Sequence, residues 1–194
     1  PFFNEKAVCE LGKNLDKSKK LHRSGTEYAL KVLKRFSEIL NVSKITNLKI
    51  IATAVLREAT DTKPFINEVE KLFKTKINIL SGEEEAECSA EGVKIGFENV
   101  NGLVADLGGG SLELARVENN IVTNKTSLPV GVLRLLNNPI VKKRNLAKYI
   151  KKLLREEKWL SKKKFNNLYL VGGTWRALFK LHLFQNNHPV HIIH

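Results

Sequence analysis

The residues of greatest chemical interest are three consecutive glycines with an acidic residue on either side. Gly108, Gly109 and Gly110 follow an apolar run that contains Asp106, and Glu113 comes shortly after them. Because glycine has no Cβ, its backbone N–H groups can approach an anion closely. Mg²⁺ takes oxygen ligands and shares them with substrate phosphates, so one or two carboxylates near such a loop are sufficient. The segment therefore indicates phosphate and metal binding.

The residues after the glycines predict a strand and not a helix. Residues 111–117 alternate with period two, and Asn119 and Asn120 then offer a turn. The glycines are therefore expected to join two strands of a hairpin. This argues against the Walker and Rossmann fingerprints, whose glycines open a helix.

A second glycine turn follows the last predicted strand, residues 167–171. Gly172, Gly173 and Thr174 come directly after it and open a predicted helix. Backbone N–H groups at a helix start can face an anion, and Thr174 is expected to cap the helix. A second phosphate-binding loop is therefore predicted here.

The elements around these turns predict two α/β parts, residues 1–80 and 81–194. In the first, a mostly buried helix begins near residues 24–27 and carries apolar side chains from Tyr28 to Leu40. It is followed by predicted strands and helices at residues 48–53, 54–59, 65–74 and 77–80. The second part opens with an acidic helix start at 81–87, where Ser81 and Glu84 form a capping box, and includes a helical segment near 147–158.

Two further residues complete a pattern that each member alone does not establish. Glu85 lies in the acidic helix start, and Arg57 follows a predicted strand. Taken singly, each candidate has an ordinary structural explanation, such as a turn acid or a surface cation. Together they supply metal ligands, a phosphate cradle and a charge clamp.

Composition restricts the partners and the compartment. The 194 residues include 33 Lys and Arg against 20 Asp and Glu, which gives a net charge of +13. This charge suits a polyanionic partner, or the lysines simply cover a solvated face. The basic runs, among them 142–144 and 162–164, lack interleaved aromatics, so direct nucleic-acid binding is not expected.

Cys9 and Cys88 show no metal spacing and predict a reducing compartment. Without a signal peptide or an apolar stretch of about 20 residues, we expect a cytoplasmic protein with no membrane partner.

Five segments resemble successive motifs of the exopolyphosphatase and guanosine pentaphosphate phosphatase (Ppx/GppA) family, in family order and at family-like spacing. They are residues Ala52–Ala59, Leu80–Ala86, Val104–Glu113, Ser127–Arg134 and Val171–Thr174. The resemblance implies a hydrolase of phosphoanhydrides with an actin-like (ribonuclease H-like) α/β fold. Residues 1–80 are then part of the first domain and 81–194 part of the second, with a cleft between them. One departure is Glu87, where family members usually have Arg.

The resemblance also implies a role for each candidate residue. Glu85 is the base that activates the attacking water, and Asp106 and Glu113 help to place Mg²⁺ and that water. The loop from Gly108 to Ser111 holds the terminal phosphate, and Arg57 adds a cationic phosphate contact. Hydrolysis of a phosphoanhydride needs such an in-line water, a base and neutralisation of negative charge.

The implied substrate is inorganic polyphosphate, guanosine pentaphosphate (pppGpp) or both, and a homodimer is a further possibility. The family begins with a strand and a phosphate loop that are not found after Pro1, and it continues beyond His194. We therefore expect an internal piece, incomplete at both ends.

Two other classes of protein stay open. Another actin-like enzyme, a kinase or ATPase, would need an adenosine pocket, for which residues 172–174 are the candidate. A non-catalytic basic protein that binds polyanions would show salt-sensitive binding to nucleic acid.

Overall fold

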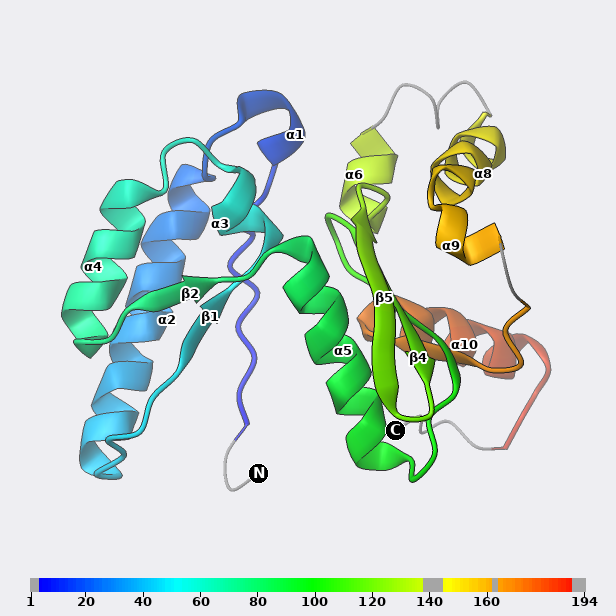
Figure 1. Cartoon of the computed structure of the whole chain (residues 1–194). Helices are drawn as coiled ribbons and strands as arrows, with labels where there is room; N and C mark the ends of the chain where they lie inside the picture. Colours follow the sequence, from blue (N-terminus) through cyan, green and yellow to red (C-terminus); the bar gives the residue numbers. More distant parts are fainter. Residues whose placement is uncertain (1–3, 138–144, 162–163, 190–194) are drawn as a thin grey trace. The chain divides into compact units, whose positions relative to one another are not determined.

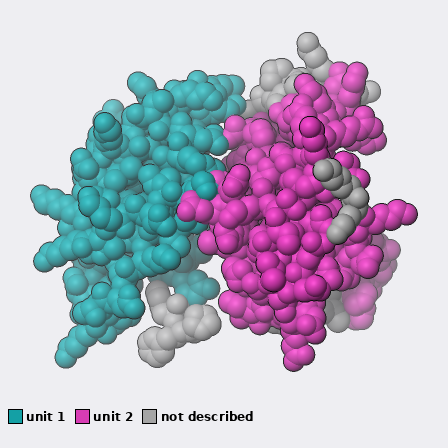
Figure 2. Space-filling model, viewed as in Figure 1, with its two compact units in different colours: residues 1–81 teal, residues 82–194 magenta. Residues whose placement is uncertain are grey.

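The computed structural model describes residues 4–137, 145–161 and 164–189, which excludes most of the basic runs at 142–144 and 162–164. The chain divides into two compact units, residues 1–81 and residues 82–194 (Figures 1 and 2). Among the described residues, no helix is both long and apolar enough to cross a membrane. Cys9 and Cys88 are free thiols.

Unit 1 is a small α/β unit in which two parallel strands are joined through helices. Its elements are α1 (Leu15–Ser18), α2 (Arg23–Val42), β1 (Ile50–Ala52), α3 (Ala54–Glu58), α4 (Lys63–Phe73) and β2 (Ile77–Ile79). β1 pairs with β2 in parallel, with Ile50 opposite Ile77. Pro64 suits the first turn of α4, where an N–H has no partner in the helix. From α2 onward the order of elements is the one that the sequence predicts, whereas the short helix α1 was not predicted.

The core of unit 1 forms where α2 and α4 meet the two strands. Ala29, Leu56, Phe65 and Val69 are its buried centre. The predicted burial of α2 is only partly right, because Tyr28 is 50% exposed. The face that packs inward is shifted and includes Gly25, Ala29, Val32 and Ser37.

Unit 2 is built on a four-stranded sheet of order β5-β4-β3-β6. Its elements are α5 (Gly82–Gly96), β3 (Gly102–Leu107), β4 (Leu112–Glu118), β5 (Ile121–Leu128), α6 (Val132–Asn137), α8 (Leu146–Glu156), α9 (Lys158–Ser161), β6 (Leu168–Val171) and α10 (Gly173–Gln185). Strands β3, β4 and β5 form an antiparallel meander, and β6 pairs with β3 in parallel.

Helices cover both faces of this sheet, so the successive side chains of a strand, which point to opposite faces, pack into two clusters. On one face, Ala86, Ala90 and Val93 of α5 pack against the cluster that contains Val104 and Val117. On the other, Ala105, Leu114 and Leu128 pack against the apolar side of α8 and α9, including Tyr149, Leu153 and Trp159. Asp106, Glu113 and the two glycine turns lie at one end of this sheet.

The predicted hairpin is confirmed. β3 and β4 pair with Leu107 opposite Leu112, so the glycines do connect antiparallel strands. The turn between β4 and β5 is made by Asn119 and Asn120, with φ of 50° and 63°. Asparagine tolerates this left-handed region better than most residues with a side chain.

The predicted cap of the last helix is wrong. Helix α10 begins at Gly173 and its N-cap position is Gly172, so Thr174 lies inside the first turn. Gly172 has φ of 102°, a conformation that residues with a Cβ rarely adopt. The chain therefore enters the helix through glycine geometry, without a side-chain cap.

Candidate active site

Three polar side chains form one row across the end of the sheet in unit 2. In the strand register, Ser127 of β5 lies opposite Glu113 of β4, and Glu113 lies opposite Asp106 of β3. Side chains of directly opposite residues point to the same face of a sheet. That face is the one covered by α5, because Ser89 of this helix reaches Asp106. The two acids that flank the glycines are therefore neighbours in space.

Glu113 is the most buried of the predicted site residues that carry an ionisable group. Its relative exposure is 4%, and its Oε1 accepts a hydrogen bond of 2.8 Å from the Ser127 hydroxyl. Burial raises the pKa of Glu113, and the charges of Glu85 and Asp106 raise it further, while hydrogen bonds from Ser111 and Ser127 oppose the shift. Glu85 is thus within electrostatic reach of Glu113.

Asp106 joins the first glycine turn to the second. Its Oδ2 accepts a 2.8 Å hydrogen bond from Ser89, whereas Oδ1 faces Gly172, where an added Cβ would lie 2.6 Å from it. The Trp175 indole N–H donates to the Ala105 carbonyl at 3.1 Å and fastens the start of α10 to β3. The structure therefore brings the turn at residues 172–174 to the predicted metal ligand.

Helix α6 donates hydrogen bonds to the carbonyls of the first glycine turn. Backbone N–H groups of Val132 and Leu133 donate to the Gly108 and Gly109 carbonyls at 3.2 and 2.9 Å. The Arg134 Nε donates to the Gly110 carbonyl at 2.8 Å. Within the described residues, no hydrogen bond occupies the N–H groups of Gly109 and Gly110. The carbonyls are thus directed into the protein, and these two amides are available to an anion.

Gly131 makes this close packing possible. A Cβ at this position would lie 2.2 to 2.4 Å from backbone atoms of Gly109, Gly110 and Ser111. Backbone therefore packs directly on backbone, and no other residue type has room.

The first turns of α5 contain the predicted base and several further acids. Glu83, Glu84 and Glu85 lie in the first turn, where carboxylates interact favourably with the helix dipole. Glu87, at the position where the family usually has Arg, forms an ion pair with Lys125 of β5. The cation near this turn is thus contributed by a strand.

Arg57 belongs to unit 1 and is positioned there by its own contacts. It lies in the last turn of α3, and its Nη1 donates to the carbonyl of Leu80, just after β2. This fixes the guanidinium beside the end of the short parallel sheet.

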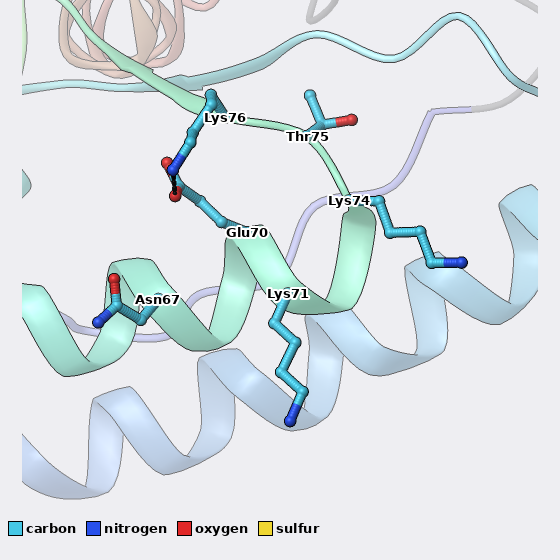
Figure 3. A pocket seen from close by; sticks show the side chains of 6 residues that line it. All are labelled: Asn67, Glu70, Lys71, Lys74, Thr75 and Lys76. Carbon is cyan, nitrogen blue, oxygen red and sulfur yellow. Dashed lines mark hydrogen bonds and ion pairs between the residues drawn. The ribbon is translucent and has the colours of Figure 1, made fainter.

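A separate hollow of about 370 Å³ lies on α4 and the turn before β2, and its lining includes none of the predicted site residues. Its lining is Asn67, Glu70, Lys71, Lys74, Thr75 and Lys76 (Figure 3). Lys76 is paired with Glu70, and Lys71 and Lys74 point in different directions. Because these ammonium groups do not converge, the hollow does not form an anion site.

The donor set suits Mg²⁺ bound partly by substrate, and not a cage made of protein alone. Among the described residues, no three His, Cys, Asp or Glu side chains are arranged to hold a metal ion. Mg²⁺ commonly uses one or two carboxylates plus phosphate oxygens and water. Asp106 and Glu113, adjacent in the row and beside the glycine loop, satisfy this smaller requirement.

Several supporting residues were not predicted from the sequence. Ser89, Ser127, Gly131, Arg134 and Trp175 each contact a predicted residue or its immediate neighbour. Ser127, Gly131 and Arg134 lie within one of the family-like motifs, which was the available signal. Their partners are 14 or more residues away in sequence, so spacing alone does not reveal them.

Comparison with known proteins defines the class. The model of the Ppx/GppA phosphatase family matches residues 1–193, and the chain belongs to this family. It is 37% identical over 134 residues to a guanosine-5'-triphosphate,3'-diphosphate pyrophosphatase of Aeromonas hydrophila, covering 69% of this chain and 27% of the relative. It is also 32% identical over 187 residues to a bifunctional 3-dehydroquinate synthase/phosphatase of Fusobacterium nucleatum, covering 89% of this chain and 28% of the relative.

Solved structures confirm that the chain has the α/β fold of this family. An exopolyphosphatase from Cytophaga hutchinsonii superimposes with a TM-score of 0.82 at 23% identity, covering 97% of this chain and 64% of that chain. A Ppx/GppA family member from Aquifex aeolicus gives 0.72 at 23% identity, covering 95% and 61%. The chain spans about a quarter of the length of the curated relatives described above.

Proposed function

We propose that the protein containing this chain is a phosphohydrolase that releases the terminal phosphate of inorganic polyphosphate, of guanosine pentaphosphate, or of both. The observation that supports it most is the row of Asp106 and Glu113 beside the glycine loop, with Glu85 within electrostatic reach. A base, a pair of metal-ligating acids and amides for a phosphate are the parts that such a reaction needs.

In this proposal, each group acts on the terminal phosphate or on the attacking water. The amides of Gly109 and Gly110 bind phosphate oxygens, and Arg57 neutralises negative charge. Glu85 accepts a proton from the water while the water oxygen attacks phosphorus. The bond between phosphorus and the bridging phosphoanhydride oxygen breaks, and that oxygen leaves with the rest of the substrate. A bound Mg²⁺, held by Asp106 and Glu113, would offset charge on the phosphate oxygens.

The decisive experiment measures phosphate release by the full-length protein carrying Glu85→Gln. A general base typically contributes about a hundred- to ten-thousand-fold, so we expect a rate loss in that range with the fold retained. Glu83→Gln is the matched control, because it removes a carboxylate from the same helical turn. A Glu85→Gln enzyme as fast as wild type would contradict the assignment of the base.

The preferred substrate requires a competition assay. Long-chain polyphosphate and guanosine pentaphosphate are offered together, and the release of phosphate from each is followed separately. Phosphoryl transfer from ATP to an acceptor, without hydrolysis of either substrate, would favour the kinase class instead. The cytoplasmic location, the dimer and the cleft between the two units stay predictions.

A further inference from the structure

Strand β5 contacts α5 at two points, one on each side of Glu85 in the sequence. Ser127 lies against Gly82 at the start of the helix, where an added Cβ would be 2.3 Å from the Ser127 Cβ. Lys125, two residues earlier on the same face of the strand, forms an ion pair with Glu87. Glu85 therefore lies between two contacts with one strand.

The second contact also balances charge at the helix start. Lys125 has its pKa raised by its hydrogen bond to Glu87, and the nearby charges of Glu83 and Glu84 contribute in the same direction. The side chains of the pair are 32% and 47% exposed, so solvent screens their attraction only in part. The Lys125 ammonium therefore offsets the mutual repulsion of the carboxylates in the first two turns of α5.

The position of α5 along the strand matters for the proposed chemistry, because Glu85 is the proposed base and lies within electrostatic reach of Glu113. Ser127 is fixed on both sides, to Gly82 through van der Waals contact and to Glu113 through its hydroxyl. This anchors the beginning of the helix. The turn that carries Glu85 is then held at its other end by the Lys125–Glu87 pair.

We propose that Lys125 is a positioning residue, which through Glu87 keeps α5 in register with β5 and so holds Glu85 within electrostatic reach of Glu113. This inference rests on the proposed function. It makes Lys125 a support for the base and not a ligand of the substrate.

Three variants of the full-length protein test it: Lys125→Met, Glu87→Gln, and the exchanged pair Glu87→Lys with Lys125→Glu. A small displacement of a catalytic group is costly, so each single change should lower kcat about tenfold with KM changed less than about twofold. The exchanged pair restores the contact and should recover most of kcat. Lys94→Met is the control, since Lys94 pairs with Glu91 on the same helix at 2.7 Å.

Two kinetic results would overturn the inference. An unchanged kcat with a raised KM would show that Lys125 contacts substrate, and a failure of the exchanged pair to recover kcat would show that pairing is not its role. Thermal unfolding of each variant shows whether the fold is retained.

Amide hydrogen exchange provides a measurement that does not depend on hydrolysis. Residues 83–89 should exchange faster in Lys125→Met and Glu87→Gln than in wild type or Lys94→Met, and the exchanged pair should restore protection. Unchanged exchange would contradict the placement of α5 by this pair. A wild-type protein that hydrolyses neither substrate would instead contradict the proposed function, and the exchange result would still stand.

Discussion

The two glycine turns of unit 2 use glycine for different reasons. In the first, at residues 108–110, the glycines have no positive φ, and the tight fit comes from Gly131, whose backbone packs on the turn. In the second, Gly172 has φ of 102° and also lies against a carboxylate oxygen of Asp106. One turn depends on the absence of a side chain in a neighbouring segment, the other on the conformation of its own residue.

This difference gives the two turns different roles in the proposed phosphate site. The carbonyls of the first turn accept hydrogen bonds from backbone N–H groups of α6, and these bonds orient the amides of the turn. The second turn orients an acid, because Gly172 defines the space in which Asp106 Oδ1 lies. Breaking each turn should therefore damage the site in a distinguishable way.

The largest effect is expected from Gly131→Ala. The new Cβ would overlap backbone atoms, which cannot move away as a flexible side chain can, so we expect a loss of about 3 kcal/mol in unfolding free energy. Displaced amides should also lower phosphate release about a thousandfold. Chemical denaturation and the hydrolysis assay measure the two effects.

Gly92→Ala is the matched control on α5, because nothing lies within 4 Å of a Cβ there. It should stabilise the helix by up to about 1 kcal/mol. If Gly131→Ala were as stable and active as this control, the backbone packing would not be what orients the first turn.

The second largest effect is expected from Gly172→Ala. A residue with a Cβ at this φ is strained by about 1 to 3 kcal/mol, and the methyl group would push Asp106 Oδ1 aside. We expect about a hundredfold loss of kcat, with a smaller loss of stability than Gly131→Ala causes. The adjacent Gly173→Ala, which meets no atom within 4 Å, should be nearly silent. Equal activities of these two neighbours would refute the distinction between the turns.

The third effect concerns the serines that hold the two acids. Ser127→Ala removes a hydrogen bond from a carboxylate that is only 4% exposed, and such a loss costs about 1 to 3 kcal/mol. Ser89→Ala removes the corresponding bond to Asp106, which is less buried. We expect the first variant to lose more stability than the second, as measured by denaturant unfolding. The reverse order would mean that burial does not set the importance of these contacts.

Much of unit 2 could be predicted from local patterns. The alternation after Gly110 and the Asn119–Asn120 turn suffice for the hairpin, because both depend on neighbouring residues only. The pairing of Asp106 with Glu113 then follows from the register of the hairpin itself. The proximity of Asp106 and Glu113 could therefore be predicted from the sequence.

The contacts that orient these acids could not be predicted in the same way. Ser127 meets Glu113 only because β5 returns to pair with β4, and Ser89 meets Asp106 only because α5 packs on that face. Thr174 illustrates the reverse error. Its type is typical of a helix cap, but Gly172, with its positive φ, takes the N-cap position, so α10 begins two residues earlier than a Thr174 cap requires.

The smallest effect is the pH dependence of stability that Glu113 contributes. Burial raises its pKa in the folded state, so the folded protein binds this proton more tightly than the unfolded chain does. As pH rises from about 4, the ordinary carboxyl range, through the raised pKa, the wild type should lose stability as Glu113 ionises. Glu113→Gln has no charge to bury, and its amide oxygen can still accept the Ser127 hydrogen bond. With a chelator present, its melting temperature should therefore exceed that of wild type by a margin that grows across this pH window and then levels off. A constant margin would show that burial does not raise the pKa of Glu113.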